Sequence, residues 1–551
     1  MKLLISSLLA IAVALGVAHA AHAKGDSVAA GPTIAIADTQ AGKVQGFVRN
    51  GVYVYRGIPY AKADRFQPPK PVESWGGTRT ALMYGNICPQ LPGNPLANFM
   101  FSGPHLEQSD DCLNLNVWTP SLSNGRRRPV MVWLHGGGFS NGSSIESYAY
   151  DGENLSRTGD VVVISVNHRL NVMGHLDLSA YGKQYANSAN SGVMDLVAAL
   201  QWVRANAAAF GGDPDNVTIF GESGGGAKVL TLMGTPAAKG LFHKGIVQSG
   251  AVGVMGMTLL SPATTRRVAE LTLQNLGVSP ADVRQLHTLP YQQIADASQK
   301  ALDQTAQEQK LPAAMGNGIG LSWTPSTDGT YIPVDPVGEK YPELSKHIPL
   351  LIGSNLTEWT TIFAFFNDIN RAQTDNKNTW SETQVNEKLR ARFGEGADSV
   401  RAAFGAAYPG RNPADALYVD SFLRIPALKT ARLKADQNGG PVYNYIFAWD
   451  TPILGGFPMS YHTSEITFVM NSLALTETQH GNGNEATALA DKMSRAWVAF
   501  ARTGNPNVDG LPDWPAYTRS SGATMVFDNQ PEVKIHHDEK LMKLLKPDAD
   551  F

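Results

Sequence analysis

The chain has 551 residues, of which 45 are Lys or Arg and 48 are Asp or Glu, so its formal net charge is −3. Hydrophobic residues make up 43% and charged residues 17%, a balance that excludes a disordered chain and a fibrous one. A charge so close to neutral argues against a nucleic-acid-binding protein, because such proteins normally carry a basic surplus. The 54 Gly and 33 Pro are too many for a helical bundle and fit loops around a sheet.

The first residues have the composition of a targeting segment. Lys2 supplies a positive charge, residues 3–17 form an apolar run with two serines, and small-x-small sequences follow up to Ala23. A transmembrane anchor is the alternative, but this run of about 15 residues is shorter than the roughly 20 that a spanning helix needs. We therefore expect a signal peptide over residues 1–23, cleaved after Ala23, and a secreted or periplasmic protein without a stable membrane anchor.

The two cysteines, Cys88 and Cys112, are not in a CxxC pattern, so a structural zinc site is not expected. An exported protein folds in an oxidising compartment, where two cysteines usually pair. The alternative is a pair of free buried thiols. The segment between the cysteines carries apolar residues such as Leu96 and Phe99, which either pack as an Ω-loop or, as we favour, roof a pocket.

Six short apolar runs rich in β-branched residues predict buried strands of a mostly parallel sheet. In chain order they are residues 130–134, 161–166, 217–220, 245–247, 350–353 and 442–446.

Helices are expected between and after these strands. Apolar residues at helical spacing over 193–203 predict a helix between the second and third strands, an order that implies right-handed crossovers and an α/β architecture. Residues 260–340 predict helices and loops inserted beside the sheet, and 485–503 predict a late amphipathic helix. The expected fold is a mostly parallel central sheet flanked by helices, with large loop and helical insertions. No repeat or low-complexity linker divides residues 24–551, which we expect to form a single domain.

A candidate nucleophile follows the third predicted strand. Residues 221–225 read G-E-S-G-G and lead directly into a helix-compatible run. In this context a G-x-S-x-G sequence holds its serine on a sharp, strained turn, with the hydroxyl projecting above the sheet. A phosphate-binding loop is the alternative, but no GKS or GKT follows and Lys228 is misplaced for a P-loop. We therefore predict Ser223 to be a nucleophile.

A second glycine-rich turn, His135 to Gly138, directly follows the strand predicted over 130–134. Nucleophilic attack on a carbonyl creates a negatively charged oxygen, which needs preorganised N–H donors. The N–H groups of Gly137 and Gly138, together with that of Gly224, are expected to form this oxyanion hole. The alternative is a flexible turn without a role.

A serine nucleophile needs a general base, most often a histidine, and an acid that orients the imidazole. His462 lies in a loop after the last predicted strand, at the sheet edge where such sites form. Glu358 follows the strand at 350–353 within a few residues and is the candidate acid. Asp328 is a rival, in a T-D-G sequence that is more typical of a simple turn.

Together these motifs resemble those of the type-B carboxylesterase/lipase family, the cholinesterase-like α/β-hydrolases, in the form of a bacterial secreted member. The resemblance spans roughly residues 40–530. It also includes RGIPYA at 56–61, DCLNLNV at 111–117, NHRL at 167–170, FGGDPDNVT at 210–218 and TGNP at 503–506.

This resemblance implies an α/β-hydrolase fold and hydrolysis of carboxylic esters through an acyl-enzyme, with no cofactor or metal. It assigns Ser223 as nucleophile, Glu358 as acid and His462 as base, and it implies a disulfide between Cys88 and Cys112.

The chain departs from the family pattern at two positions. Gly224 stands where the residue after the nucleophile is usually Ala, and Trp359 stands where the residue after the acid is usually Gly. The second departure is expected to place a large ring near the site. Phe139, Met255 and Trp359 are candidate walls of a substrate pocket, although each alone also fits a place in the core.

The function expected from the sequence is that of a serine carboxylesterase acting on a small-molecule ester. One alternative is a lipase with interfacial activation through the 88–112 loop. Another is a non-catalytic, cholinesterase-like binding protein, which the intact serine, glycine-rich turn and late histidine argue against.

Overall fold

The computed structural model describes residues 27–92, 102–122, 125–250, 258–311, 320–336, 338–361 and 371–551. The predicted signal peptide, the pocket candidate Met255, and the apolar residues Leu96 and Phe99 of the 88–112 loop lie outside these ranges.

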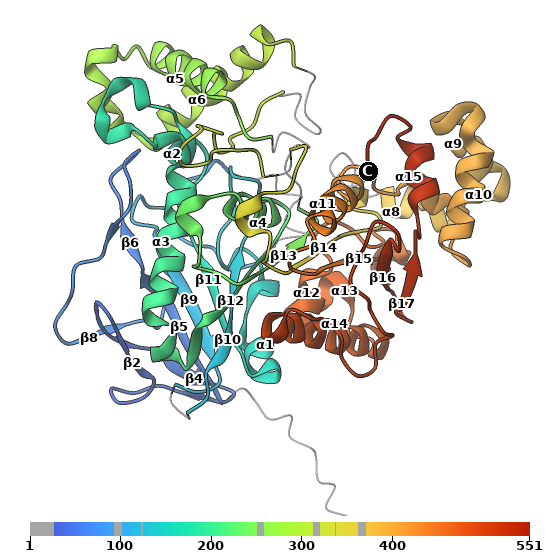
Figure 1. Cartoon of the computed structure of the whole chain (residues 1–551), viewed down its shortest axis with the longest axis horizontal. Helices are drawn as coiled ribbons and strands as arrows, with labels where there is room; N and C mark the ends of the chain where they lie inside the picture. The colour runs from blue at the N-terminus through green and yellow to red at the C-terminus, as the bar shows by residue number, and fades with distance from the viewer. Residues whose placement is uncertain are drawn as a thin grey trace, which may run out of the picture.

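The central element is a sheet of 12 strands in the order β1-β4-β5-β9-β11-β10-β12-β13-β14-β15-β16-β17 (Figure 1). The strands from β11 to β16 in this order run parallel to their neighbours, whereas pairings at both margins are antiparallel. In spatial order the strands are β1 (Val28–Ala29), β4 (Phe47–Arg49), β5 (Val52–Pro59), β9 (Asn114–Thr119), β11 (Val162–Val166), β10 (Arg128–Leu134), β12 (Gly212–Glu222), β13 (Lys244–Gln248), β14 (Leu350–Asn355), β15 (Val442–Phe447), β16 (Ala523–Phe527) and β17 (Glu532–Ile535).

All six predicted strands are present, and the mostly parallel α/β sheet is confirmed. The largest difference in bounds is in β12, which begins at Gly212 rather than at residue 217. Its first residues are polar, so they carry no hydrophobic signal. They belong to the strand because Gly212 aligns with Arg128 of β10, with a register shift before Val217.

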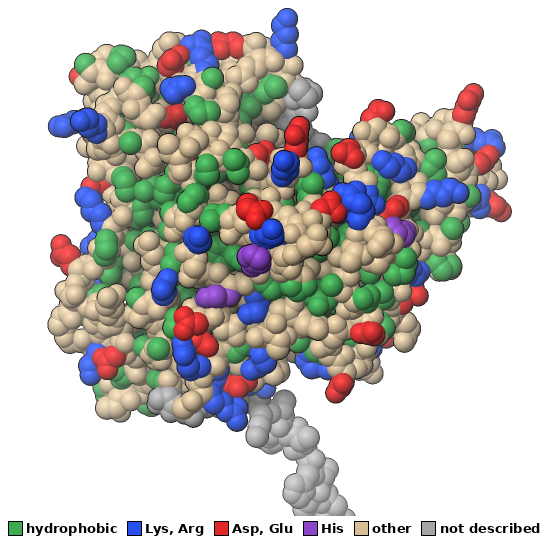
Figure 2. Space-filling view, viewed as in Figure 1, with side chains coloured by type: hydrophobic (Ala, Val, Ile, Leu, Met, Phe, Trp, Pro, Cys, Tyr) green, Lys and Arg blue, Asp and Glu red, His purple; other side chains and the backbone are tan. Residues whose placement is uncertain are grey.

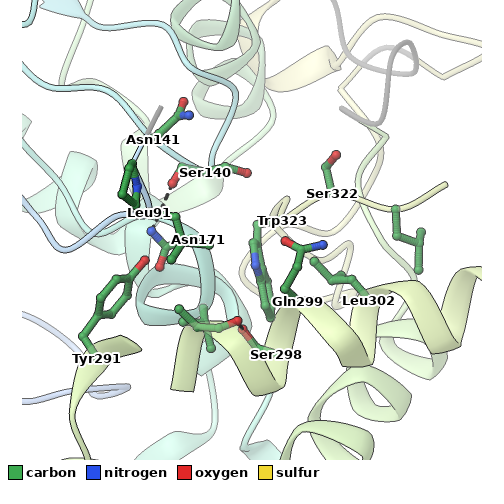
Figure 3. Close-up of a pocket in the computed structure, with 14 residues that line it drawn as sticks. Leu91, Ser140, Asn141, Asn171, Tyr291, Ser298, Gln299, Leu302, Ser322 and Trp323 are labelled. Atoms are coloured by element: carbon green, nitrogen blue, oxygen red, sulfur yellow. Dashed lines mark hydrogen bonds between the residues drawn. The ribbon is translucent and has the colours of Figure 1, made fainter. Parts of the chain in front are cut away.

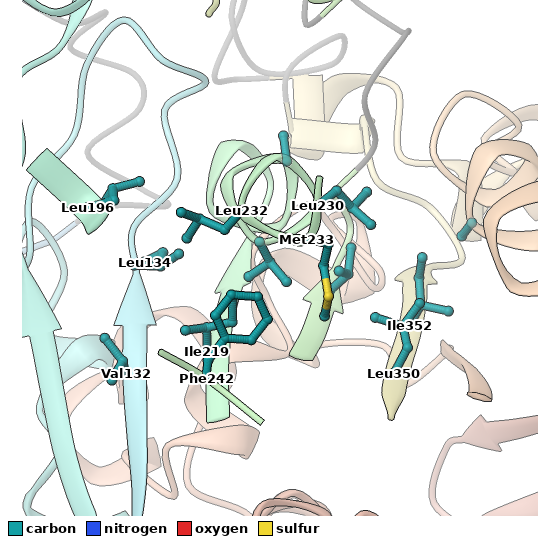
Figure 4. Packing of buried hydrophobic residues seen from close by; sticks show 14 of the residues in the cluster. Val132, Leu134, Leu196, Ile219, Leu230, Leu232, Met233, Phe242, Leu350 and Ile352 are labelled. Atoms are coloured by element: carbon teal, nitrogen blue, oxygen red, sulfur yellow. The ribbon is translucent and has the colours of Figure 1, made fainter. Parts of the chain in front are cut away.

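Two hydrophobic cores lie on opposite faces of the sheet, because side chains alternate along each strand. In β10, Val130 and Val132 face the core shared with helices α3 and α4, whereas Met131 and Trp133 face the core shared with α14. Figure 4 shows Val132 and Leu134 near Leu196 of α3 and Leu232 of α4. Burial on both faces explains why these strands are continuous apolar runs.

The helices cover both faces of the sheet and extend beyond it (Figure 1). The predicted helix at 193–203 is part of α3, and the predicted helix at 485–503 is α14. The described α-helices are α1 (Glu153–Gly159), α2 (Asn171–His175), α3 (Ser191–Asn206), α4 (Gly224–Met233), α5 (Pro262–Leu276), α6 (Tyr291–Glu308), α8 (Arg371–Thr374), α9 (Glu382–Phe393), α10 (Ala397–Ala407), α11 (Arg424–Asp436), α12 (Ile466–Val469), α13 (Glu477–His480), α14 (Asn484–Thr503) and α15 (Glu539–Leu545).

The insertion predicted over residues 260–340 contains α5 and α6, which lie beyond the sheet at the upper left of Figure 1. They pack on each other and on α2 around a separate hydrophobic cluster. Two small sheets stand apart from the central one: β2 (Ile36–Thr39), β3 (Gly42–Gln45) and β8 (Thr78–Thr80) form the first, and β6 (Ala61–Lys62) and β7 (Lys70–Pro71) form the second.

Cys88 and Cys112 are joined by a disulfide, with their Cα atoms 5.0 Å apart, so the alternative of two free thiols is wrong. Among the residues that the structure describes, no helix combines the length and apolar character needed to cross a bilayer. Figure 2 shows Lys and Arg side chains interspersed with Asp and Glu over the visible face, as the near-zero net charge predicts.

Candidate active site

Ser223 occupies the sharp turn between β12 and α4 that the sequence predicts. Its φ of 55° and ψ of −121° are in a region that residues other than glycine rarely adopt. The Ser223 N–H donates a 2.8 Å hydrogen bond to the carbonyl oxygen of Gln248 at the end of β13, which helps to hold the strained conformation. The serine is half-buried.

The glycines on either side of Ser223 are required by close backbone packing. A Cβ atom at Gly221 would lie 2.5 Å from the carbonyl oxygen of Leu134, and one at Gly225 would lie 2.0 Å from the same atom. Real Cβ atoms do not approach this closely. The G-x-S-x-G spacing therefore allows the turn to press against the end of β10.

The glycine-rich turn after β10 lies beside this serine. Gly137 and Gly138 have positive φ angles of 76° and 61°, which favour glycine. A Cβ atom on Gly136 would lie 3.6 Å from Cβ of Ser223, and one on Gly224 would lie 2.3 Å from the carbonyl oxygen of Gly138. The three residues predicted to form the oxyanion hole, Gly137, Gly138 and Gly224, therefore lie in one small region.

The predicted base and acid meet at the ends of β14 and β15. His462 Nδ1 lies 2.7 Å from Glu358 Oε2. The backbone N–H of His462 also donates a 2.7 Å hydrogen bond to the backbone carbonyl oxygen of Glu358. Glu358 is fully buried, and its Oε1 accepts a 2.7 Å hydrogen bond from the N–H of Asn355. The rival acid Asp328 instead accepts hydrogen bonds from the N–H groups of Thr330 and Ile332, so it closes a local turn.

A further carboxylate, Glu222, faces the other nitrogen of the imidazole. Its Oε1 lies 3.3 Å from His462 Nε2, and among the described residues neither of its oxygens accepts a hydrogen bond. Because Glu222 immediately precedes Ser223 in the chain, the imidazole lies beside the serine turn. The sequence predicts no role for Glu222, which is the variable residue before the serine in the G-x-S-x-G motif.

The charges around His462 determine its protonation. Burial alone would lower the pKa of His462, but the charges of Glu222 and Glu358 outweigh burial and raise that pKa above its ordinary value of 6.5. Burial also raises the pKa of Glu222 well above its ordinary value. Both shifts favour the bound proton, so the two groups compete for a proton between them.

Two of the three predicted pocket walls lie near the site. The Trp359 ring stacks on His462 with 4.8 Å between ring centroids, and its Nε1 donates to Asp420 Oδ1 at 2.9 Å. The departure from the family pattern thus places a large ring against the imidazole. Phe139 is 1% exposed and packs its edge against His175.

A cavity of about 190 Å³ opens beside the glycine-rich turn (Figure 3). Its lining combines apolar side chains with hydroxyl and amide groups, contributed by several segments that include α6. A Cβ atom on Gly137 would lie 2.3 Å from the carbonyl oxygen of Asn141, so the cavity wall borders the candidate oxyanion hole. The labelled lining residues are Leu91, Ser140, Asn141, Asn171, Tyr291, Ser298, Gln299, Leu302, Ser322 and Trp323. None of them was singled out from the sequence, since they are far apart in the chain.

Comparison with known proteins shows similarity over nearly the whole chain. The family model described as "Carboxylesterase family" matches residues 33–544. Para-nitrobenzyl esterase of Bacillus subtilis is 35% identical over 518 residues, covering 92% of this chain and 98% of that protein. Phenmedipham hydrolase of Pseudarthrobacter oxydans is 32% identical over 511 residues, covering 90% and 95%. A solved esterase from Clostridium hathewayi, described as hydrolysing aliphatic aromatic polyesters, is 38% identical with a TM-score of 0.86, covering 96% of this chain and 100% of that one.

Proposed function

The chain belongs to the carboxylesterase family and is a carboxylic ester hydrolase, and we propose that it works through an acyl-enzyme on Ser223. In this proposal His462 is the general base and Glu358 is the acid that orients it. The observation that carries the assignment is the position of the imidazole. Its Nδ1 is held 2.7 Å from Glu358, while its Nε2 points toward the turn that bears Ser223.

The reaction begins when neutral His462 takes the proton of the Ser223 hydroxyl as its oxygen attacks the ester carbonyl. The carbonyl oxygen becomes negatively charged and is stabilised by the N–H groups of Gly137, Gly138 and Gly224. His462 then gives its proton to the departing alcohol, which leaves an acyl group on Ser223. A water molecule, deprotonated by the same imidazole, hydrolyses this acyl-enzyme and restores the serine.

For proton transfer, His462 Nε2 exchanges its contact with Glu222 for a hydrogen bond with the serine hydroxyl, through rotation of either side chain. His462 Nε2 lies 3.3 Å from Glu222 Oε1, and Ser223 is the next residue in the chain. Hydrogen bonds between catalytic groups are often long without substrate and tighten in the complex. Glu358 orients the imidazole during this exchange, since its own Oε1 is held by a backbone N–H donor.

Covalent labelling tests the nucleophile. A fluorophosphonate should label the wild-type protein once per chain, and Ser223→Ala should abolish both labelling and hydrolysis of p-nitrophenyl acetate. Ser249 offers a matched control, because it also lies directly after a parallel strand with a positive φ of 46°. Ser249→Ala should retain labelling. Labelling that persists in Ser223→Ala would exclude Ser223.

Aromatic esters are the first substrates to test. The relatives described above are named for para-nitrobenzyl and phenmedipham substrates, and the related solved esterase for aliphatic aromatic polyesters. The cavity in this chain has an indole from Trp323 and the ring of Tyr291 in its lining. A panel of p-nitrophenyl esters with aromatic acids and with aliphatic acids of graded length compares these classes directly. Turnover of short soluble esters below their micelle threshold would oppose the alternative of interfacial activation.

We also propose that the protein is exported. A disulfide such as Cys88–Cys112 persists in oxidising compartments and is rare in the reducing cytosol. If the segment before residue 24 is removed on export, N-terminal sequencing of the secreted or periplasmic protein should begin at Lys24. Accumulation of the full-length chain in the cytosol would contradict this.

A further inference from the structure

Lys228 is a fully buried lysine in the second turn of α4, in contact with the glycine-rich turn. Its Nζ donates hydrogen bonds to the carbonyl oxygens of His135, at 2.8 Å, and Gly136, at 3.2 Å. The lysine therefore links the helix that begins at the nucleophile to the turn that carries the other two candidate oxyanion donors.

Burying the Lys228 ammonium group costs free energy, so its presence at this position calls for a specific role. Burial lowers the pKa of Lys228 to about 7, and the charge of Glu146 opposes this. Glu146 is half-buried and accepts a 3.2 Å hydrogen bond from the Tyr150 hydroxyl. The ring of Phe139 lies 5.8 Å from Nζ. An apolar side chain in this position would avoid the desolvation of an ammonium group, yet it would remove the Lys228 donor from the carbonyl oxygen of His135 and leave that of Gly136 with only its 3.0 Å contact to His135 Nδ1.

The planar peptide unit couples the contact of Lys228 to the orientation of an N–H group in the proposed oxyanion hole. A peptide bond is planar, and in the trans form its C=O and N–H groups point in opposite directions. The described chain contains no cis peptide bonds. The carbonyl oxygen of Gly136 and the N–H of Gly137 belong to one peptide unit. A donor that fixes the carbonyl oxygen therefore also fixes the direction of the N–H.

The sequence of the first turn of α4 leaves room for this contact. Gly224 and Gly225 have no side chains, and the backbone of the glycine-rich turn lies against them. Side chains on a helix lean toward its N-terminus. The long side chain of Lys228 can therefore run back along α4 and reach the carbonyl oxygens of the turn.

We propose that Lys228 is a positioning residue, which holds the carbonyl oxygens of His135 and Gly136 and thereby aims the N–H of Gly137 at the oxyanion of the reaction. This inference rests on the proposed function, because it concerns the donors of the proposed oxyanion hole. The ammonium group also polarises the peptide that it binds, which makes the N–H a stronger donor.

The test compares Lys228→Met with the wild-type protein. Loss of one well-placed oxyanion donor lowers kcat by about 10²–10³-fold, and we expect Lys228→Met to lose about 10²-fold. KM should change by less than about threefold, because the donor acts mainly in the transition state. An aryl trifluoromethyl ketone, which forms a tetrahedral adduct with a serine oxygen, should bind more weakly by the same factor as the loss in kcat. Lys228→Gln keeps a neutral N–H donor, so its kcat and inhibitor affinity should lie between those of Lys228→Met and the wild-type protein.

Lys434 supplies a matched control. It is also fully buried, and its Nζ donates to the carbonyl oxygens of Ser345, at 3.0 Å, and Lys346, in the segment that precedes β14, whereas Glu358 follows the other end of that strand. Lys434→Met removes the same kind of contact and should leave kcat and inhibitor affinity unchanged, even where it lowers stability.

Fluorophosphonate labelling separates the inference from the proposed function. In Lys228→Met, labelling should be slower but should still reach one label per folded chain, and rates are expressed per labelled site so that partial misfolding does not distort them. If Lys228→Met and Lys228→Gln both keep wild-type kcat and inhibitor affinity per site, Lys228 does not position the turn. If Ser223→Ala is still labelled, the proposed nucleophile is wrong, whatever Lys228 does.

Discussion

Glu222 should set the lower pH limit of activity through its charge on His462. The two groups are 3.3 Å apart, and both are buried. With an effective dielectric constant of about 20, opposite unit charges at this distance interact by about 5 kcal/mol. Each 1.36 kcal/mol of such an interaction changes a pKa by one. Burial also favours a proton on Glu222, which reduces the charge that His462 experiences. We therefore expect Glu222→Gln to lower the pKa of His462 by about 1 to 3.

The assay is the pH dependence of kcat/KM for a soluble p-nitrophenyl ester. Only neutral imidazole can accept the serine proton, so activity falls as the pH drops through the pKa of His462. Because that pKa is raised in the wild-type protein, its acid limb should lie above pH 6.5. In Glu222→Gln the negative charge is absent, the pKa falls, and the acid limb should move to lower pH.

Glu465 provides a graded control for this experiment. It is also buried near His462 and contributes to its raised pKa less than Glu222 does. Its oxygens accept hydrogen bonds from Asn355, at 2.8 Å, and Gln248, at 3.1 Å. Glu465→Gln should shift the acid limb in the same direction by a smaller amount. An unchanged acid limb in Glu222→Gln would show that the proton resides on Glu222 rather than on His462, and the electrostatic reasoning would be refuted.

Three further changes test the packing of the molecule. Gly224→Ala should lower kcat by about 10-fold or more, measured with p-nitrophenyl acetate, because its Cβ would lie 2.3 Å from the Gly138 carbonyl oxygen and displace an oxyanion donor. Leu302→Trp should fill part of the cavity and shift preference toward shorter esters in the graded panel, and an unchanged preference would show that the cavity does not bind substrate. Asp538→Asn should lower the free energy of unfolding in urea by about 3–5 kcal/mol, because it breaks the buried pair with Arg424. The charge of Arg424 outweighs burial and lowers the pKa of Asp538. The stabilisation from this pair should therefore be present above about pH 4 and lost in stronger acid. Equal free energies of unfolding for the variant and the wild-type protein at pH 7 would contradict this prediction.

The parts of the molecule that could be predicted from the sequence are those with a strong local signal. Strands buried on both faces are short apolar runs, so β10, β11 and β13 were predicted with nearly their observed bounds. The G-x-S-x-G turn was predictable for a related reason. Its glycines are required by contacts of under 3 Å with the end of β10, and such steric requirements restrict the residue type at each position.

The parts that were missed depend on contacts between distant segments. In the sequence Lys228 is only a lysine misplaced for a P-loop, and its proposed role depends on the contact between α4 and the turn after β10. The cavity combines residues from Leu91 to Trp323, which no local pattern connects. Glu222 stood inside a recognised motif, but its meaning depends on the distance to His462, 240 positions later in the chain.

The order of the parallel strands explains how these distant residues form one site. Parallel strands end at the same edge of a sheet, and β10, β12, β13, β14 and β15 are consecutive in space. The glycine-rich turn follows β10, Ser223 follows β12, Glu358 follows β14, and His462 follows β15. The strand between them, β13, contributes no proposed catalytic group, but its last residue, Gln248, accepts the hydrogen bond from the Ser223 N–H. The Gln248 side chain is in turn held by Trp497, whose Nε1 lies 3.0 Å from its Oε1. The strained backbone of Ser223 is thus supported by a buried neighbour in the middle of the sheet.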